Sequence, residues 1–274
     1  MSDRFDVTIL GCGSSGGVPR LGGVDCAGDW GVCDRNDPKN RRTRCSLLVQ
    51  RHGQNGVTRI LVDTSPDMRE QLLRARVADL DGVLITHDHA DQLHGLDDLR
   101  QVVHYRRRRV DIHTDAKTAE AILSRFSYCF VTPEGSEYPP IANMHTIPEP
   151  FAPFPLDGAG GPVPILAFSQ RHGAVRSLGF RFGPVAYSAD VSALDEVAFA
   201  ALDGVECWIV DALRRTPHPS HAHVALALEW IARVKPKRAV LTNLHHDLDY
   251  EILKRELPEN VEPAHDGLSI MVRL

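Results

Sequence analysis

The chain has 274 residues, of which 43% are hydrophobic and 24% charged, with a net charge of −5 and a pI near 6.3. The acidic balance argues against a globally basic nucleic-acid-binding protein. No apolar run approaches the roughly 20 residues that cross a bilayer, and residues 1–6 lack the basic and apolar regions of a signal peptide. We therefore expect a cytoplasmic protein without a membrane partner, whose six cysteines stay reduced rather than form a disulfide framework.

The first half of the chain predicts alternating strands and helices. Val7 and Ile9 alternate with polar neighbours in a first strand at residues 6–11, and a glycine-rich turn follows at 11–17. The other predicted strands are 45–51, 59–63, 83–86 and 110–114, with a turn at 52–56. The predicted helices are 66–76, 96–105 and 116–126.

A proline-rich stretch then interrupts this rhythm. Residues 132–164 contain nine of the 18 prolines and predict a long, mostly irregular connection, which is either a lid or partner contact or a plain surface insertion. After it, the predicted strands are 163–169, 178–182, 185–188, 207–211, 238–242 and 269–272, and the predicted helices are 193–202, 221–234 and 250–257. We predict one domain over residues 1–274, with similar halves at about 1–126 and 163–274 joined by 127–162, stacked as an α/β four-layer sandwich.

The segment at residues 85–95, Ile-Thr-His-Asp-His-Ala-Asp-Gln-Leu-His-Gly, carries the clearest chemical signal. His87, His89 and Asp91 alternate, and alternate residues of an extended chain point to one side. Two imidazoles and a carboxylate converging past a buried strand suit zinc, manganese or iron. The alternative is a polar loop whose histidines only cap a helix, and the two interleaved aspartates argue against it.

This segment resembles the metallo-β-lactamase superfamily signature His-x-His-x-Asp-His, and further pieces follow in the family's order. Asp63 resembles the strand-end aspartate that precedes the signature, His172 the third histidine, and Asp190 the carboxylate that bridges two metals. Residues 241–246, Leu-Thr-Asn-Leu-His-His, stand at the place of the last ligand. The resemblance covers nearly the whole chain. It implies the metallo-β-lactamase αββα sandwich and one or two divalent ions, zinc and/or manganese.

Within the superfamily, the chain is most similar to the PhnP-type branch, whose members are cyclic phosphodiesterases of the phosphoribosyl cyclic phosphodiesterase kind. This branch is related to the tRNA 3′-processing endonucleases. The segments that carry this likeness are 10–19, 40–46, 248–250 and 266–267. The likeness implies a phosphodiesterase that cleaves small cyclic phosphodiesters, such as phosphoribosyl 1,2-cyclic phosphate or a nucleoside cyclic phosphate, through a metal-bound hydroxide. Its partner would be a small phosphate-containing substrate or a nucleotide.

Two positions depart from the family pattern, and both belong to its second metal site. Gln92 stands where the signature ends in histidine, and Asn243 where the last-ligand histidine is expected. The implied first site is intact, with the ligands His87, His89, His172 and Asp190. The second would rest on Asp91 and Asp190 with Gln92, Asn243 or His245, and amide oxygens favour manganese or magnesium. His245 either replaces the missing ligand or is an ordinary loop histidine.

The resemblance also implies the catalytic residues, which are His221, Asp91 and Asp63. His221 best matches the histidine that protonates the leaving oxygen in PhnP-type enzymes, with His223 as the alternative. Without catalysis, His221 would be an exposed histidine at a helix start that Ser220 caps. Asp63 would hold a ligand histidine in its tautomer. The predicted substrate contacts are Gln92, Asn243, Ser14, Ser15 and His223, with the two serines in a phosphate cradle.

Other polar clusters give weaker signals. Cys26, Cys33 and His246 resemble part of a structural zinc site found in some family members, but three ligands leave a tetrahedron incomplete, which favours free thiols. The arginine run at 106–109, like Arg41, Arg42 and Arg44, could meet a phosphate, although a solvated face is the usual role. The run has few aromatic neighbours, so sequence-specific nucleic-acid binding is not indicated.

Two alternatives to a phosphodiesterase stay open at the level of sequence. The same fold and metal centre serve thioester and lactone hydrolases, although these enzymes usually keep the histidine that Gln92 replaces. A non-catalytic sensor that binds a nucleotide or metabolite with one metal would explain the changes at Gln92 and Asn243. Because symmetric dimers are the commonest soluble oligomers, a homodimer is the expected assembly.

Overall fold

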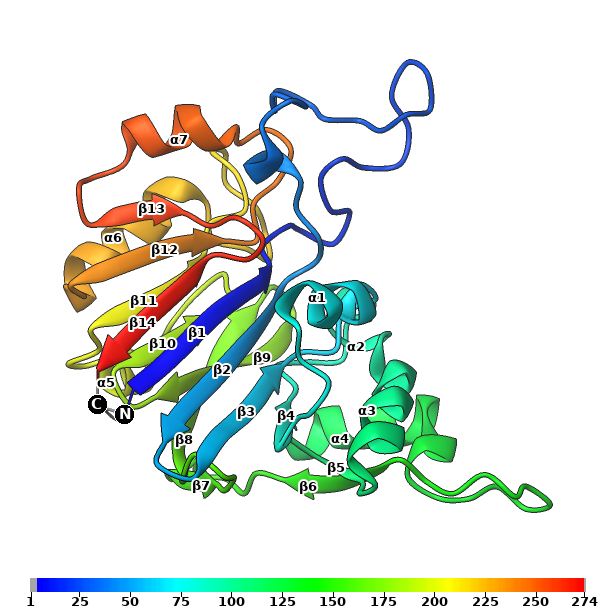
Figure 1. The fold of residues 1–274 in the computed structure, drawn as a ribbon. Helices are drawn as coiled ribbons and strands as arrows, with labels where there is room; N and C mark the ends of the chain where they lie inside the picture. Colours follow the sequence, from blue (N-terminus) through cyan, green and yellow to red (C-terminus); the bar gives the residue numbers. More distant parts are fainter. Residues whose placement is uncertain (1–3, 274) are drawn as a thin grey trace. The chain divides into compact units, whose positions relative to one another are not determined.

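The computed structural model describes residues 4–273, which form strands and helices in alternation (Figure 1). Residues 1–3, which enter the signal-peptide expectation, lie outside the described residues. The chain forms two compact units. The first unit runs up to Thr8, then covers Ser46–Val163, and resumes at Ser269; the second covers Ile9–Cys45 and Pro164–Leu268. The single domain over residues 1–274 stays a prediction.

The first sheet has seven strands in the order β14-β1-β2-β3-β4-β5-β6. Their bounds are β1 Arg4–Gly11, β2 Ser46–Gly53, β3 Gly56–Val62, β4 Gly82–Leu84, β5 Val110–Thr114, β6 Ala142–Thr146 and β14 Ser269–Arg273. The accompanying helices are α1 Met68–Ala75, α2 Ala90–Leu93, α3 Leu99–Arg106 and α4 Ala116–Arg125, with short 3-10 turns η2 Leu96–Asp98 and η3 Ser127–Cys129. Strands β3 to β6 are mutually parallel, so their carboxyl ends share one edge of the sheet.

The second sheet also has seven strands, in the order β13-β12-β11-β10-β9-β8-β7. Their bounds are β7 Phe154–Leu156, β8 Val163–His172, β9 Val175–Phe182, β10 Val185–Ser188, β11 Cys207–Asp211, β12 Arg238–Thr242 and β13 Val261–Pro263. The remaining helices are η1 Pro38–Asn40, α5 Glu196–Ala201, α6 Val224–Val234 and α7 Tyr250–Glu256. Strands β10 to β13 are parallel, and every residue of β11 is buried, as expected for a central parallel strand.

Several predicted boundaries were wrong. The stretch 132–164 is mostly irregular, as predicted, but it also contains β6 and β7, and β6 pairs in parallel with β5 along its whole length. Sequence periodicity does not reveal such a strand, since partner pairing rather than alternation defines it. The helix expected at 221–234 begins at Val224 and has His223 as its N-cap, so Ser220 does not cap it. The predicted turn at 52–56 is shorter, because β2 extends to Gly53 and β3 starts at Gly56.

The cysteine and membrane expectations can be compared with the described residues. All six cysteines are free of disulfides, and Cys12, Cys45, Cys129 and Cys207 are buried. None of the helices within 4–273 combines the length and apolar character that a membrane span requires. Arg106 pairs with Asp79 and Asp81, and its side chain is 5% exposed, so this arginine is neither a solvated side chain nor a phosphate contact.

A buried arginine forms hydrogen bonds with several loop residues of the second unit. Arg42 is 1% exposed, and its guanidinium donates to the carbonyl oxygens of His245 at 3.0 Å and Leu248 at 2.6 Å and to Asn40 Oδ1 at 3.1 Å. Asn40 Nδ2 in turn donates to Asp249 Oδ2 at 2.7 Å. Because these carbonyls belong to the chain that follows β12, Arg42 fixes the path of the segment after Asn243.

We predict that Arg42→Met destabilises the protein by roughly 2–4 kcal/mol, because it leaves buried carbonyl oxygens without donors. Urea unfolding followed by circular dichroism measures the change. Arg41→Met is the matched control, since Arg41 is exposed and lies over the Trp30 ring at 5.3 Å, and its loss should cost less than about 1 kcal/mol. Equal destabilisation by both substitutions would contradict the role assigned to Arg42.

Candidate metal centre

A hydroxyl relay orients the first histidine of the signature. The Asp63 carboxylate, just past β3, accepts from the Thr86 amide at 2.8 Å and from Thr86 Oγ1 at 3.0 Å. Thr86 Oγ1 lies 3.0 Å from His87 Nδ1. Because the hydroxyl proton goes to Asp63, the oxygen accepts from His87 Nδ1–H, and Nε2 keeps the lone pair that binds a metal. Asp63 therefore acts on His87 through Thr86, not by direct contact.

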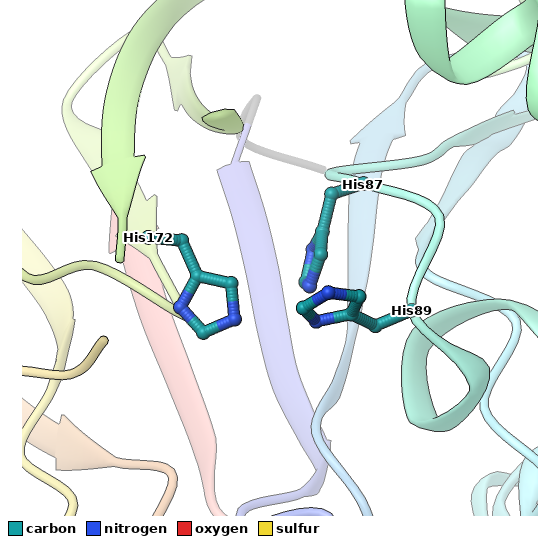
Figure 2. A group of neighbouring side chains, drawn as sticks. All are labelled: His87, His89 and His172. Carbon is teal, nitrogen blue, oxygen red and sulfur yellow. The ribbon is translucent and has the colours of Figure 1, made fainter. Parts of the chain in front are cut away.

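The two histidines of the signature lie next to each other. The ring of buried His87 meets the ring of exposed His89 edge to face, with centroids 4.5 Å apart. Figure 2 shows these two side chains next to each other. Asp91 does not continue an extended segment, as the alternation argument assumed, because it lies in the first turn of α2. Buried Gln92 follows it, and its Nε2 lies 3.4 Å from Asp91 Oδ2. Gln92 thus directs its donor, not its oxygen, at the neighbouring carboxylate.

Three further candidate ligands come together within the second unit. His172, labelled in Figure 2, ends β8, and its Nδ1 donates to the carbonyl oxygen of Ser220 at 2.6 Å. This bond leaves His172 Nε2 as the metal-binding atom, and Nε2 lies 3.9 Å from Asp190 Oδ1. His172, Asp190 and His221 each offer a ligand atom within 4.8 Å of the others. Both His172 and Asp190 are at least 96% buried.

A buried carboxylate holds His221, and sequence reasoning missed it. Asp211, the fully buried last residue of β11, accepts at Oδ2 from His221 Nδ1 at 2.8 Å and from the Val191 amide at 3.0 Å. Burial raises the pKa of the Asp211 carboxyl, while the bond and charge of His221 oppose this rise. One signal could have revealed it: Asp211 ends a parallel strand between the strands that precede Asp190 and Asn243.

Asn243 is oriented as a hydrogen-bond donor rather than as a metal ligand. Its Nδ2 lies 3.5 Å from Asp190 Oδ1, and its Oδ1 lies 3.8 Å from Cys45 Sγ. His221 Nδ1 is 3.0 Å from Nδ2 but gives its proton to Asp211, so it is not an acceptor for the amide. A metal would need the amide oxygen, which faces away from Asp190. Within the second unit, His172, Asp190 and His221 could thus hold an ion, whereas Asn243 directs a donor at Asp190.

Three polar residues just past strand ends have left-handed backbones. These residues are Asp63, Asp190 and Asn243, with φ of 63°, 53° and 63°. Aspartate and asparagine tolerate this conformation better than other non-glycine residues, and such strain gathers at functional sites.

The other predicted site residues have varied surroundings. Ser14 is buried and Ser15 exposed in the glycine-rich turn, and His223 is the N-cap of α6. His245 Nδ1 lies 2.9 Å from Asp247 Oδ1. Burial and, second, the charge of Arg20 lower the pKa of His245. The groups of possible ligands among residues 4–273 contain neither Asp91 nor His245, so their roles as ligands stay predictions.

The cysteines near the second unit's loops do not form a ligand group with His246 in the described part of the chain. Cys26 is exposed, whereas Cys33 is buried and its Sγ donates to the carbonyl oxygens of His246 at 3.4 Å and Leu248 at 3.5 Å. His246 Nδ1 lies 3.3 Å from Asp29 Oδ2. The preference for free thiols over a structural zinc site stays a prediction.

Comparison with known proteins identifies the family. Residues 58–245 match the β-lactamase superfamily domain, and the chain belongs to this family. A solved structure described as a new diphosphatase from the PhnP family is similar, with a TM-score of 0.86 and 33% identity over 100% of this chain and 99% of that chain. The predicted fold class and the predicted likeness to the PhnP-type branch are confirmed, with two mixed sheets flanked by helices.

More distant relatives support the fold alone. The metallo-β-lactamase fold protein YhfI from Bacillus subtilis has a TM-score of 0.71 and 18% identity, covering 98% of this chain and 100% of that chain. The short form of human tRNase Z has a TM-score of 0.61 and 16% identity, covering 97% and 98%. A curated relative, the octanoyltransferase of Porphyromonas gingivalis, is 31% identical over 96% of this chain. The chain spans about half, 51%, of that relative's length.

We predict that Thr86→Val lowers the affinity for zinc or manganese about 10- to 100-fold, because it breaks the relay that orients His87. Competition with a chromophoric chelator measures the affinity. Thr114→Val is the matched control, since Thr114 is also buried and bonds through Oγ1 to the Ile85 carbonyl at 2.9 Å without touching a histidine. Similar losses in the two variants would show that the relay has no specific effect.

A second prediction concerns the number of ions. The purified chain should hold about one tightly bound divalent ion, because Gln92 and Asn243 present donors where the family has imidazoles. Restoring both histidines, in Gln92→His with Asn243→His, should raise the content towards about two ions per chain. Elemental analysis after exhaustive dialysis decides the point, and two tightly bound ions in the unaltered chain would disprove the prediction.

Proposed function

We propose that this chain is a metal-dependent phosphodiesterase that acts on small cyclic phosphodiesters, such as phosphoribosyl 1,2-cyclic phosphate or a nucleoside cyclic phosphate. The proposed metal ligands are His87, His89, His172 and Asp190. The observation that carries the proposal is the Asp211–His221 pair, which lies within reach of Asp190 in the second unit. The similar PhnP-family diphosphatase supports chemistry at phosphorus. The cytoplasmic location and the homodimer stay predictions.

The partner of each histidine supports a different role for it. Thr86 and the Ser220 carbonyl are uncharged partners of His87 and His172, and they suit neutral imidazoles that bind a metal through Nε2. Asp211 is a carboxylate, which stabilises a positively charged His221. An imidazolium held at Nδ1 can give its Nε2 proton to a departing oxygen. His221 is therefore the proposed general acid, and Asp211 its positioning residue.

A divalent ion bound by these ligands supplies Lewis acidity and lowers the pKa of a bound water to about 7. The chain's own groups do the rest. Asp63 and Thr86 hold His87 in its metal-binding tautomer, and Ser220 does the same for His172. Asn243 donates towards Asp190, and its hydrogen bond to Asp211 opposes the rise that burial causes in the pKa of that carboxyl. In the proposal, Ser14 and Ser15 contact the phosphate.

We predict that His221→Ala retains its metal and loses about 10²- to 10⁴-fold in kcat on a nucleoside 2′,3′-cyclic phosphate, whose alkoxide leaving group needs a proton. The loss on bis(p-nitrophenyl) phosphate should be much smaller, because p-nitrophenolate leaves without protonation. His89→Ala should lose both metal and turnover of either ester. Metal analysis and steady-state kinetics on one preparation measure these effects.

His223→Ala tests the alternative acid: His223 is the N-cap residue of α6, and with His221 as the acid the kcat of this variant should stay well above that of His221→Ala. Equal losses on both esters in His221→Ala would rule out a general acid. Loss of metal in that variant would make His221 a ligand instead, an outcome that its place in the His172–Asp190 group allows.

A thioester hydrolase is a second candidate, which the octanoyltransferase relative favours. An octanoyltransferase transfers an acyl group, as a thioester hydrolase does. However, the match covers 51% of that relative, so its transferase activity can reside in the half that this chain does not match. Release of thiol from an octanoyl thioester, assayed beside the cyclic phosphate, separates the two candidates. Turnover of neither substrate by protein with a bound ion would favour the non-catalytic sensor.

A further inference from the structure

Asp63 and Asp190 have the same kind of backbone support, one in each unit. Both residues are left-handed, and each follows a strand that pairs with an antiparallel neighbour, β3 with β2 and β10 with β9. When these registers are continued past the strand ends, Ser46 stands opposite Asp63 and Ser177 stands opposite Asp190. Both serines are fully buried. A buried hydroxyl therefore accompanies each aspartate at the same place in its sheet.

Ser46 holds the backbone of Asp63 in the first unit. Its Oγ shares one proton between the carbonyl oxygens of Val62 at 2.9 Å and Asp63 at 3.0 Å. The Asp63 amide donates to the Leu84 carbonyl at 2.9 Å. The chain is thus fixed on both sides of the Asp63 Cα, and because the side chain leaves that atom, its direction is fixed as well. The carboxylate then reaches Thr86, where the relay begins.

Ser177 does the same for Asp190 in the second unit. Its Oγ donates to the Asp190 carbonyl oxygen at 2.7 Å, and the Val191 amide donates to Asp211 Oδ2 at 3.0 Å. The peptide group that follows Asp190 is therefore held at its oxygen by one residue and at its nitrogen by another. With this peptide group fixed, Asp190 Oδ1 lies 3.9 Å from His172 Nε2.

A buried glutamine directs the Ser177 hydroxyl. Gln170 is 2% exposed, and its Nε2 donates to Ser177 Oγ at 3.3 Å and to the Ala189 carbonyl at 3.2 Å. A Cβ at Gly179 would lie 2.7 Å from Gln170 Oε1, so the glycine leaves room for this amide. Because the Ser177 oxygen accepts from Gln170, its own proton is left for Asp190. Two successive carbonyls, those of Ala189 and Asp190, are thus held where the chain turns.

We propose that Ser46 and Ser177 are positioning residues of the metal centre, which hold Asp63 and Asp190 in the left-handed conformation that sets the direction of their carboxylates. Ser177 acts directly on a proposed ligand, whereas Ser46 acts through Asp63 on His87. Metal sites lose affinity when the supporting residues let the ligands move, even though no ligand is removed. The inference rests on the proposed function for the ligand roles of His87 and Asp190.

The affinity for zinc tests the proposal without turnover. Ser46→Ala and Ser177→Ala should each bind zinc about 10- to 100-fold more weakly than the unaltered chain, as measured by competition with a chromophoric chelator. Cobalt(II) adds a spectroscopic readout, because its visible absorption depends on the arrangement of its ligands. Ser177→Ala should change this absorption, since the residue that it releases is itself a proposed ligand.

Two other buried serines provide matched controls. Ser188 is the last residue of β10, and its Oγ accepts from Trp208 Nε1 at 3.0 Å. Ser65 lies two residues after Asp63, and its Oγ donates to Gln71 Oε1 at 3.0 Å. Ser188→Ala and Ser65→Ala should keep the zinc affinity within about twofold, because these hydroxyls support other side chains. Urea unfolding of the metal-free variants shows that each one is folded.

Ser46→Cys and Ser177→Cys keep the test open where alanine prevents folding, because a thiol fills similar space and is a weaker donor. These variants should also bind zinc more weakly. Unchanged affinity in the Ser46 or the Ser177 variants, or an equal loss in the two controls, would overturn the inference.

Hydrolysis measured on the same preparations separates this inference from the proposed function. Weaker zinc binding in the serine variants of a chain that hydrolyses neither phosphate ester would keep the inference and remove the phosphodiesterase. Hydrolysis of the cyclic phosphate, together with a zinc affinity that does not depend on the serines, would do the reverse. An unaltered chain that binds no zinc would overturn both.

Discussion

Parallel strands end at a common edge, and the chemistry of this chain depends on the polar residues at and just beyond those ends. In the second unit, β10, β11 and β12 lie side by side, and Asp190, Asp211 and Asn243 come at or after their carboxyl ends. In the first unit, Asp63 and the histidine segment follow β3 and β4 in the same way. The left-handed conformation of Asp63, Asp190 and Asn243 costs on the order of 1–3 kcal/mol each. Buried hydrogen bonds offset that strain, such as the bond from Ser177 Oγ to the Asp190 carbonyl at 2.7 Å.

The hydrogen-bond partners of the histidines give these chemically identical side chains different proposed roles. An imidazole can bind a metal when it is neutral and can act as an acid when it is charged. A threonine hydroxyl and a backbone carbonyl orient His87 and His172, whereas a buried carboxylate holds His221. All three residues are histidines, so it is the charge of the hydrogen-bond partner that supports the proposal of His87 and His172 as metal ligands and of His221 as the acid.

The departures from the family pattern form a consistent set. Gln92 and Asn243 are amides whose nitrogen atoms lie near Asp91 and Asp190, so they provide donors next to carboxylates where the family places a cation. The buried Cys45 Sγ lies 3.8 Å from Asn243 Oδ1 and closer, at 3.4 Å, to the Gly13 carbonyl oxygen. The family membership shows the fold, and these local contacts distinguish this chain within it.

The sequence by itself determined the fold class, the strand cores and the order of the candidate ligands. Strands at Val110–Thr114, Val185–Ser188 and Cys207–Asp211 were predicted to the residue, because short apolar or alternating runs between polar turns define them locally. The spacing of His87 and His89 likewise needs no tertiary information.

Only the tertiary structure decided which distant groups meet. The bond between Asp211 and His221, the direction of the Asn243 amide and the bond from Ser177 to the Asp190 carbonyl all depend on contacts between segments whose sequences carry no sign of one another. Strand β6 and the helical position of Asp91 were missed for the same reason. Local preferences are weak compared with pairing and burial, so register and side-chain direction are settled when the chain packs.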